Sequence, residues 1–497
     1  MRTRGEGSGR YVFFVLASLA LLMSSIDSTI VAVAIPQLTG ALHAPLTWVG
    51  WTLTAYQLVQ VVMMPLAGRL SDALGRKRVF LCCAGVFTLG SLLCGLAPSI
   101  GFLILFRAFQ ALGGGGLMPS AVGIVSDQFG NRRAQARGLF SSIFPMGAII
   151  GPNLGGFILH NWSWRELFFI NVPLGVVVVV GVKILLQDDR AAERKLDVDF
   201  RGIALFAGAV LALMYGMTAV GNDPALLSSP LLWALMGASG GLFALFLRHT
   251  RVTAAPLVRY DLLARNPFLA ANLYNFFYGV AALGFSSFVP YYAVVRYGMS
   301  AFESGAVLTP RAIAMIVVSA LASLYVIRLG YRLPMIAGLV LVSLGLILAG
   351  QGWMSLELGP LTIGGFWLLA AIIAINGVGS GLGAPASSNA SLDLAPKDAA
   401  ALTGLRGMFR QTGAAVGTAT VVMALSFFPD KAQGLSVIFV ALSGLLLLTI
   451  PLVFMIPDTA RERLILRQRG LQAAEALRSE VAVASVVQGG AGESRRG

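Results

Sequence analysis

The sequence predicts an all-α polytopic membrane protein with 14 transmembrane helices and both termini in the cytoplasm. Three observations lead to this prediction. The 497-residue chain is 57% hydrophobic and 12% charged, whereas soluble domains are usually about 45–50% apolar and roughly 25% charged. Its apolar residues form long runs, most of which reach the roughly 17–25 residues that a membrane span needs. Its basic residues gather at alternate connections between these runs.

Each span is placed on one apolar run. The runs are continuously apolar and do not alternate as a barrel strand would, so they predict helices rather than a β-barrel. The expected spans cover residues 11–34, 46–67, 79–98, 101–125, 138–160, 167–187, 201–221, 229–248, 267–293, 303–327, 333–353, 361–388, 404–427 and 434–456.

The basic residues provide an independent check on this division into spans. Of the 36 lysines and arginines, nearly all lie at the N-terminus, in every second connection or in the tail, and we count Arg406 and Arg410 with the connection before the thirteenth span. This is the positive-inside pattern, and one missed or extra helix would break it. It also explains the net charge of +14 without nucleic acid. The exceptions are Arg107, Arg165, Arg296, Arg311 and Lys431.

The connection between the second and third spans, "GRLSDALGRKRV", concentrates charge and glycine. We expect Gly68 to permit close helix contact, Gly75 to form a tight turn, and Asp72 to cap a helix or pair with an arginine such as Arg76. An ordinary positive-inside loop would explain the basic residues but not the spacing of the acid and the glycines. This frame resembles the signature loop of the major facilitator superfamily.

Further segments resemble the 14-helix drug:proton antiporter branch of that superfamily, in the expected order. They are "LLMSSIDSTIVAVAIPQL", "FRAFQALGGG", "GAIIGPNLGG", "WSWRELFFINVPLG" and, in the second half, "RGMFRQTGAAVGTA", which carries Arg410, Gln411 and Gly413. The resemblance implies two six-helix bundles and one extra helix pair. We therefore expect an N-terminal bundle over 1–187, a linker and the extra pair over 188–265, a C-terminal bundle over 266–457 and a partly disordered cytoplasmic tail over 458–497.

Asp27 in the first span and Arg107 in the fourth are the intramembrane charges that we expect to couple transport to protons. A charge at the middle of a bilayer costs about 2.5–3.5 kcal/mol on insertion scales, so such a residue is a functional hypothesis by default. Removal from water favours the protonated carboxyl, so Asp27 could load and release a proton. Proximity to Arg107 would instead hold it ionised, and their depths are compatible. The alternative is a static pair that fixes helix packing.

Two further sets of residues point to conformational change. The fifth span spaces small residues four apart and includes a proline, which predicts a bendable gate helix, with plain close packing as the alternative; its residues are Gly147, Gly151, Pro152, Gly155 and Gly156. The resemblance also implies a cytoplasmic latch formed by Asp72, Arg76 and Asp127, framed by Gly68 and Gly75. A degenerate echo, "IRLGYRL" over 327–333, has Ile327 in place of the acid, which suggests a carboxylate latch in one half only.

Polar residues within the apolar runs are candidates for a central substrate cavity. Asn275 and Tyr278 share one face of the ninth span because they are three residues apart; interhelical hydrogen bonds are the alternative for each. Arg311 either gives the cavity an anion-tolerant side or extends outward to the interface. The candidates are Gln57, Gln110, Asn275, Tyr278, Glu303, Arg311 and Asn376.

Together these features predict a secondary transporter in a bacterial inner membrane, not an enzyme. We expect it to export hydrophobic or amphipathic, drug-like compounds in exchange for protons by alternating access, with export or flipping of lipids or lipophilic metabolites as the alternative. The proton gradient supplies the energy, and no cofactor, metal or nucleic acid is expected. We expect a monomer surrounded by membrane lipids. No nucleophile or paired carboxylates suggest a membrane enzyme, and the short loops argue against a receptor or scaffold.

Overall fold

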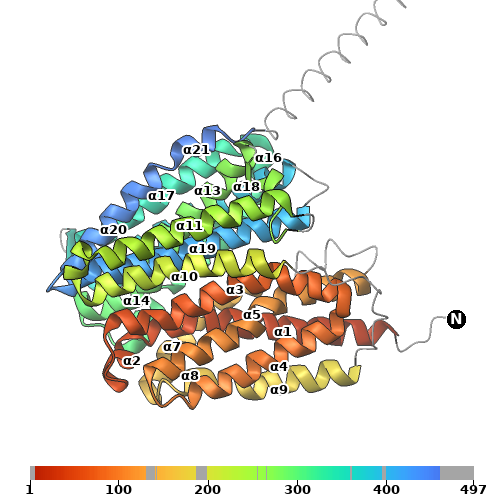
Figure 1. Cartoon of the computed structure of the whole chain (residues 1–497). Coiled ribbons are helices and arrows are strands. Elements are labelled where there is room, and N and C mark those ends of the chain that lie inside the picture. The colour runs from red at the N-terminus through yellow and green to blue at the C-terminus, as the bar shows by residue number, and fades with distance from the viewer. Residues whose placement is uncertain are drawn as a thin grey trace, which may run out of the picture.

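The structure is a computed structural model in which long helices run roughly parallel (Figure 1). It describes residues 6–129, 140, 143–185, 199–253, 256–264, 266–358, 361–394 and 399–458. The described chain begins and ends at the same end of the molecule (Figure 1).

The N-terminal helices form one group, drawn from red to yellow in the lower half of Figure 1. The third helix of this group continues well beyond its expected span, to the turn that precedes the fourth. The group consists of α1 (Glu6–Val33), α2 (Ile35–Ala41), α3 (Leu46–Leu74), α4 (Arg76–Gly95), α5 (Ile100–Phe129), α7 (Ile143–Asn161), α8 (Glu166–Phe169) and α9 (Asn171–Leu185).

The C-terminal helices form the second group, drawn from green to blue in the upper half of Figure 1. A π-helical segment, η3, interrupts the span formed by α13 and α14. The group consists of α13 (Asn266–Tyr278), η3 (Gly279–Leu283), α14 (Gly284–Tyr297), α15 (Ala301–Ala306), α16 (Thr309–Leu329), α17 (Arg332–Gln351), α18 (Gly365–Leu394), α19 (Ala399–Ser426), α20 (Lys431–Leu447) and α21 (Ile450–Phe454).

The elements between the two groups are α10 (Phe200–Asn222), the 3₁₀ turn η2 (Pro224–Ser228), α11 (Pro230–Val252) and α12 (Tyr260–Ala264). Polar contacts tie this segment to α3. Near the N-terminal end of α3, Thr47 donates to Asn222, and Trp51 Nε1 donates to Thr218 Oγ1 at 2.6 Å.

Near the other end of α3, Arg69 Nη2 donates to the Pro256 carbonyl at 2.5 Å. Toward the second group, α10 packs through apolar side chains, and no hydrogen bond joins α10 to α19 among the described residues. The apolar contact involves Phe206, Val210 and Met214 of α10 with Leu402, Leu405 and Met408 of α19.

Asp199 fastens the start of α10. Its carboxylate accepts from the Gly202 amide at 2.8 Å as an N-cap, from the Leu257 amide at 2.9 Å, and contacts His249 Nε2 at 2.6 Å. Burial alone would raise the pKa of Asp199, but these hydrogen bonds outweigh it and hold that pKa below the usual range. One carboxylate therefore joins α10, α11 and the segment that follows.

Each of the 14 expected apolar runs overlaps a helix, and in the described part of the chain 11 helical segments are long and apolar enough to cross a membrane. The helices α3, α7 and α19 are not among the 11, so the count of 14 spans stays a prediction. Two of these helices, α3 and α19, pack against each other and are joined by a polar contact: Gln411 Nε2 donates to Gln60 Oε1 at 3.1 Å.

A short hairpin departs from the expected all-helical chain. Strands β1 (Ser355–Leu358) and β2 (Leu361–Gly364) pair antiparallel, with Ser355 opposite Gly364 and Leu358 opposite Leu361. The expected twelfth span therefore begins as strand, and its helix starts at Gly365.

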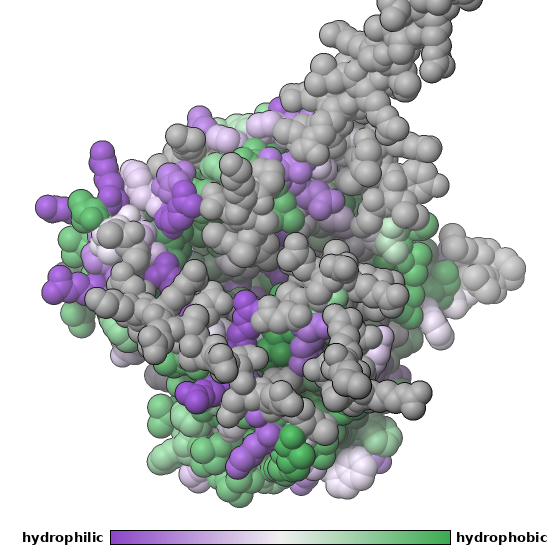
Figure 2. Space-filling view, turned by 90° about the vertical axis from the view of Figure 1, so that its right-hand side faces the viewer, coloured by the Kyte–Doolittle hydropathy of each residue, from purple (hydrophilic) through white to green (hydrophobic). Residues whose placement is uncertain are grey.

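The surface matches what a bilayer requires. Large apolar side chains are exposed along the helices, including Leu231 at 78%, Trp233 at 62% and Val252 at 77% on α11. Figure 2 views the end from which the N-terminus departs, and there hydrophilic residues gather while hydrophobic residues flank them. The chain is an integral membrane protein with multiple spans.

Candidate functional site

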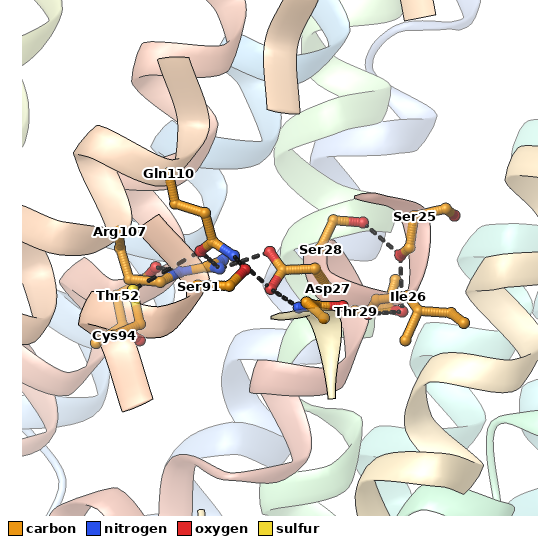
Figure 3. A network of polar contacts seen from close by, with 11 residues as sticks. Ser25, Ile26, Asp27, Ser28, Thr29, Thr52, Ser91, Cys94, Arg107 and Gln110 are labelled. Atoms are coloured by element: carbon orange, nitrogen blue, oxygen red, sulfur yellow. Dashed lines mark hydrogen bonds and ion pairs between the residues drawn. The ribbon is translucent and has the colours of Figure 1, made fainter. Parts of the chain in front are cut away.

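A buried ion pair lies inside the N-terminal group. Arg107 Nη1 of α5 donates to Asp27 Oδ2 of α1 at 2.6 Å, and both side chains are 0% exposed (Figure 3). Arg107 lies 80 residues after Asp27 in the sequence, so only the packing of α5 against α1 brings the two charges together. The similar depths expected for these two charges are realised as a direct contact.

Two amides complete the surroundings of the Asp27 carboxylate. Gln110 Nε2 donates to Asp27 Oδ1 at 2.9 Å, and Asn171 Nδ2 of α9 donates to the same oxygen at 3.1 Å. Gln110 also donates to Ser91 Oγ at 2.6 Å and accepts from Arg107 Nη1 at 2.6 Å. Gln110 is fully buried in this cluster, so in this structure it belongs to the surroundings of Asp27, and its place in a substrate cavity stays a prediction.

Besides Asp27 and Gln110, Arg107 has two partners on α3. Its Nε donates to the Thr52 carbonyl of α3 at 3.1 Å, and its guanidinium carbon lies 4.0 Å from the centre of the Tyr56 ring, a cation–π distance. Its Nη2 is buried and donates to nothing in the described part of the chain. The charged cluster therefore draws on α1, α3, α4, α5 and α9, and exchange of a proton with water requires these helices to move apart.

The predicted gate helix α7 packs directly on the turn of α1 that carries Asp27. A Cβ atom added at Gly147 would collide with Ser25, one at Gly151 with Thr29, and one at Gly155 would lie 2.7 Å from Ile30. These glycines therefore permit close backbone approach, so the close packing named as the alternative for this pattern is present, and the bendable gate stays a prediction.

The opposite side of α7 faces the C-terminal group. A Cβ at Gly156 would lie 2.7 Å from the Ala301 carbonyl oxygen, and one at Gly305 would collide with the Pro152 carbonyl. Asn153 and Thr309 exchange two hydrogen bonds, at 2.7 and 3.0 Å. Helix α7 is thus clamped between α1 and the α15–α16 segment, which links the two groups.

The charged loop after α3 is partly as expected. Gly75 has φ of +96°, a conformation that favours glycine, and it forms the turn between α3 and α4. Arg76 Nη1 donates to the Gly123 carbonyl of α5 at 2.7 Å, one turn before Asp127. The side chains of Asp72 and Asp127 lie outside the described part of the chain.

The expectation for Gly68 was wrong. A Cβ at Gly68 would meet nothing within 4 Å, so this glycine does not mediate a close helix contact. The glycine pattern of this loop therefore has one structural cause, the turn at Gly75.

The corresponding connection in the second half acquires its carboxylate from elsewhere in the chain. Gly330 has φ of +76°, and Asp458 accepts from the Tyr331 amide at 2.7 Å and from the Arg332 amide at 3.4 Å. Arg332 also donates to the Phe454 carbonyl at 3.0 Å. Although Ile327 replaces the local acid, this connection is fastened to the segment after α21.

Arg311 does not extend outward. Its Nε donates to Asn376 Oδ1 of α18 at 2.8 Å, and its backbone packs against Gly377 so closely that a Cβ there would collide with it. Its side chain therefore lies between α16 and α18, and the interpretation of Arg311 as a residue that reaches the interface was wrong.

Glu303 does not belong with the cavity residues. It is exposed and forms a capping box with Ser300 at the start of α15, in which Ser300 N donates to Glu303 Oε2 at 2.9 Å. The capping signal, a serine three residues before a glutamate, was present in the sequence.

The remaining predicted cavity residues come from both groups. Tyr278 OH donates to Ser380 Oγ at 2.8 Å, and Asn275 Oδ1 accepts from Arg406 Nε at 3.2 Å. The Gln57 Oε1 atom is buried without a hydrogen-bond partner in the described part of the chain.

The second-half motif packs α19 against α13 and η3. A Cβ at Gly413 would collide with the Phe276 carbonyl, and one at Gly279 with the Arg410 carbonyl. Arg406 and Arg410 are the eighth and twelfth residues of α19 (Ala399–Ser426), so both lie inside a helix and not in a loop, and their assignment to the cytoplasmic side stays a prediction.

Sequence reasoning did not single out Asn171, Arg406 or Asn153. Asn171 lies in the "WSWRELFFINVPLG" segment, whose resemblance was noted as a block, and Arg406 begins the "RGMFRQTG" segment. A polar residue inside an otherwise apolar run was the available signal in each case.

Comparisons with known proteins agree with this architecture. The chain is 31% identical over 386 residues to the multidrug transporter protein MdtP of Bacillus subtilis, covering 78% of this chain and 69% of the relative. It is 30% identical over 422 residues to the tetracenomycin C resistance and export protein of Streptomyces glaucescens, covering 83% and 76%. Both relatives thus match most of the chain.

Solved structures show the same fold at low sequence identity. A crystal structure of a peptide transporter in complex with sulfate superposes with a TM-score of 0.66 at 15% identity, over 90% of this chain and 93% of the other. The sequence profile of the Major Facilitator Superfamily matches residues 17–323 and 271–491. The chain therefore belongs to the major facilitator superfamily and is a relative of multidrug efflux transporters.

Proposed function

We propose that this protein exports hydrophobic or amphipathic compounds from the cytoplasm or inner leaflet in exchange for protons. The observation that supports this most directly is the fully buried pair of Asp27 and Arg107. An ionised pair is expensive to bury, and an intramembrane carboxylate is a frequent proton carrier in transporters. Both termini would face the cytoplasm of a bacterium, as the basic connections predict.

Helix α7 provides the proposed link between the proton site and the substrate site. Its glycines pack on the Asp27 turn of α1, and its Asn153 binds Thr309, two residues before Arg311. A change in the position of α7 would therefore disturb Asp27 and the C-terminal group together. In alternating access, such a shared element lets protonation of one site bias the opening of the other.

Proton-driven transport can be tested in proteoliposomes that hold the purified protein. A panel of neutral, cationic and anionic fluorescent amphiphiles would be followed with and without a pH gradient. We expect gradient-dependent transport of at least one member, and loss of the gradient dependence in Asp27→Asn. Undiminished gradient-driven transport by Asp27→Asn would remove Asp27 from the proposed role.

A conservative variant outside the cluster serves as the control. Asp261→Asn alters an exposed carboxylate on α12, 52% exposed and 2.6 Å from Arg259, and transport should be unchanged. Lipid export is distinguished by the same vesicles carrying fluorescent phospholipids: gradient-dependent flipping with no transport of the panel would replace the proposed substrate class by lipids.

A further inference from the structure

The C-terminal group carries arginines inside its helices, and none of them forms an ion pair with a carboxylate in the described part of the chain. Arg410 is the twelfth residue of α19, about 16 Å from its start at 1.5 Å per residue. Arg311 reaches Asn376, the twelfth residue of the 30-residue α18. In the described spanning helices α16 to α21 the single acid is Asp393, which accepts from Tyr331 OH at 2.7 Å.

The hydrogen bonds of these arginines leave much of their donor capacity unused. Arg311 donates to Asn376, while Arg406 donates to Asn275 and, at 3.3 Å, to the Ala384 carbonyl. Arg410 donates to no group in the described part of the chain. Each guanidinium has five N–H donors, more than the printed hydrogen bonds of any of the three arginines use, and all three residues keep some exposed surface.

The three arginines share one neighbour. Tyr278 OH donates to Ser380 Oγ, and Ser380 lies one helical turn after Asn376, the partner of Arg311. Arg406 donates to Asn275, three residues before Tyr278, and a Cβ at Gly279, the residue after Tyr278, would collide with the Arg410 carbonyl. The Tyr278 ring stacks on that of Tyr274, with centroids 6.3 Å apart and planes 15° apart. An aromatic surface therefore adjoins the positive charge.

An unpartnered donor provides a second, independent observation. Asn376 is 0% exposed and its Oδ1 accepts from Arg311, but its Nδ2 has no hydrogen-bond partner in the described part of the chain. A buried amide donor without a partner costs about 1–3 kcal/mol. The cluster thus contains both uncompensated charge and an unused donor.

We infer that Arg311, Arg406 and Arg410, with Tyr278 and Asn376, form a binding site for an amphiphilic anion. The anionic oxygens of a carboxylate, sulfonate or phosphate match the arginine forks, and the tyrosines contact the apolar body. The N-terminal group differs because its Arg107 is already paired with Asp27. The inference rests on the proposed function, since it names the substrate class that this exporter carries.

Binding is tested with purified full-length protein in neutral detergent, without a proton gradient. The probes are anthracene-9-carboxylate and its uncharged methyl ester, which share the aromatic body. We expect the carboxylate to bind at least about tenfold more tightly than the ester, because hydrogen bonds to charged groups contribute about 1.5–3 kcal/mol. Equal affinity for the two probes would overturn the inference.

Variants locate the site. Arg410→Gln should weaken carboxylate binding about tenfold or more and leave ester binding unchanged, whereas Arg410→Lys should retain part of the preference. The matched control is Arg296→Gln at the outer end of α14, where Arg296 donates to the Gly352 carbonyl at 2.9 Å; it should bind as the parent does. Unchanged carboxylate binding by well-folded Arg410→Gln and Arg311→Gln would refute the site.

A competition experiment with lipids distinguishes two possible sources of the anion, a lipid headgroup and a soluble amphiphile. In nanodiscs, displacement of the carboxylate by phosphatidylglycerol but not phosphatidylcholine would assign a lipid headgroup, while retained binding in both would assign a soluble amphiphile. The outcomes for the two proposals also differ. Binding of the carboxylate without gradient-driven export would refute proton-coupled transport alone, and gradient-driven export of neutral or cationic amphiphiles alone would refute the anion site alone.

Discussion

Removing both charges of the Asp27–Arg107 pair distinguishes a proton carrier from a static packing device. In Asp27→Asn, Arg107 stays buried without its counter-charge, and breaking a buried pair costs about 3–5 kcal/mol. Arg107 keeps the Thr52 carbonyl, the Gln110 oxygen and the Tyr56 ring, so we expect the lower value, about 3 kcal/mol. The double variant Asp27→Asn/Arg107→Gln buries no charge and should regain most of that loss.

The thermal stability of the purified variants measures the first part of this prediction. An unfolding entropy of about 2.1 cal/mol/K per residue over 497 residues gives about 1 kcal/mol/K, so the single variant should melt about 3 °C lower. The exposed pair of Asp261 and Arg259 is the matched control, because exposed ion pairs contribute about 0–1 kcal/mol. Its double variant should melt within about 1 °C of the parent.

Transport by the same variants in proteoliposomes decides the role. If Asp27 carries the proton, the double variant recovers stability but not gradient-driven transport. Recovery of both properties would show a structural pair and refute the proposed coupling. A single variant as stable as the parent would refute the energetic argument, because it would mean that Arg107 has no need of its partner.

Three other substitutions test separate parts of the structure. Gly151→Ala places a Cβ against Thr29 of α1, so we expect a loss of about 1–3 kcal/mol from overpacking and slower transport, whereas Gly237→Ala on α11, where nothing lies within 4 Å, should leave both unchanged. Asp72→Asn should reduce the turnover rate of transport more than substrate affinity; an equal loss of affinity would contradict a latch. Asp199→Asn should lower the melting temperature at neutral pH. Since the folded pKa of Asp199 is depressed, its contribution is present above about pH 4 and is lost as pH falls through the folded value, so a difference that persists unchanged at pH 3 would contradict the hydrogen-bonding account.

Residues whose role follows from depth in the membrane were predictable from the sequence. Asp27 and Arg107 stand out because each is a charge in an apolar run, and span boundaries place them at similar depths. Their actual contact depends on how α1 and α5 cross, and the two amide partners come from α5 and α9. No single helix carries the information that brings α1, α5 and α9 together at one carboxylate.

Residues near span boundaries were harder to assign. Arg406 was counted as a cytoplasmic charge because it lies at the boundary of an apolar run. Helix α19 begins at Ala399, seven residues earlier, so the boundary of an apolar run does not mark the beginning of its helix. Glu303 was judged by its position beside a span, although its local capping signal was the stronger guide. Gly68 shows that glycine spacing alone does not establish a close contact.

The attachments of α10 determine which half of the transporter carries the extra helix pair as it moves. Directional bonds at Thr47 and Trp51, and the Arg69 bond near the other end of α3, fix the pair to the first half, whereas its contact with α19 is apolar. Apolar surfaces can slide past each other without breaking hydrogen bonds. We therefore expect the helix pair to stay with the N-terminal group during alternating access, and we expect its apolar face toward α19 to be the surface along which the C-terminal group moves.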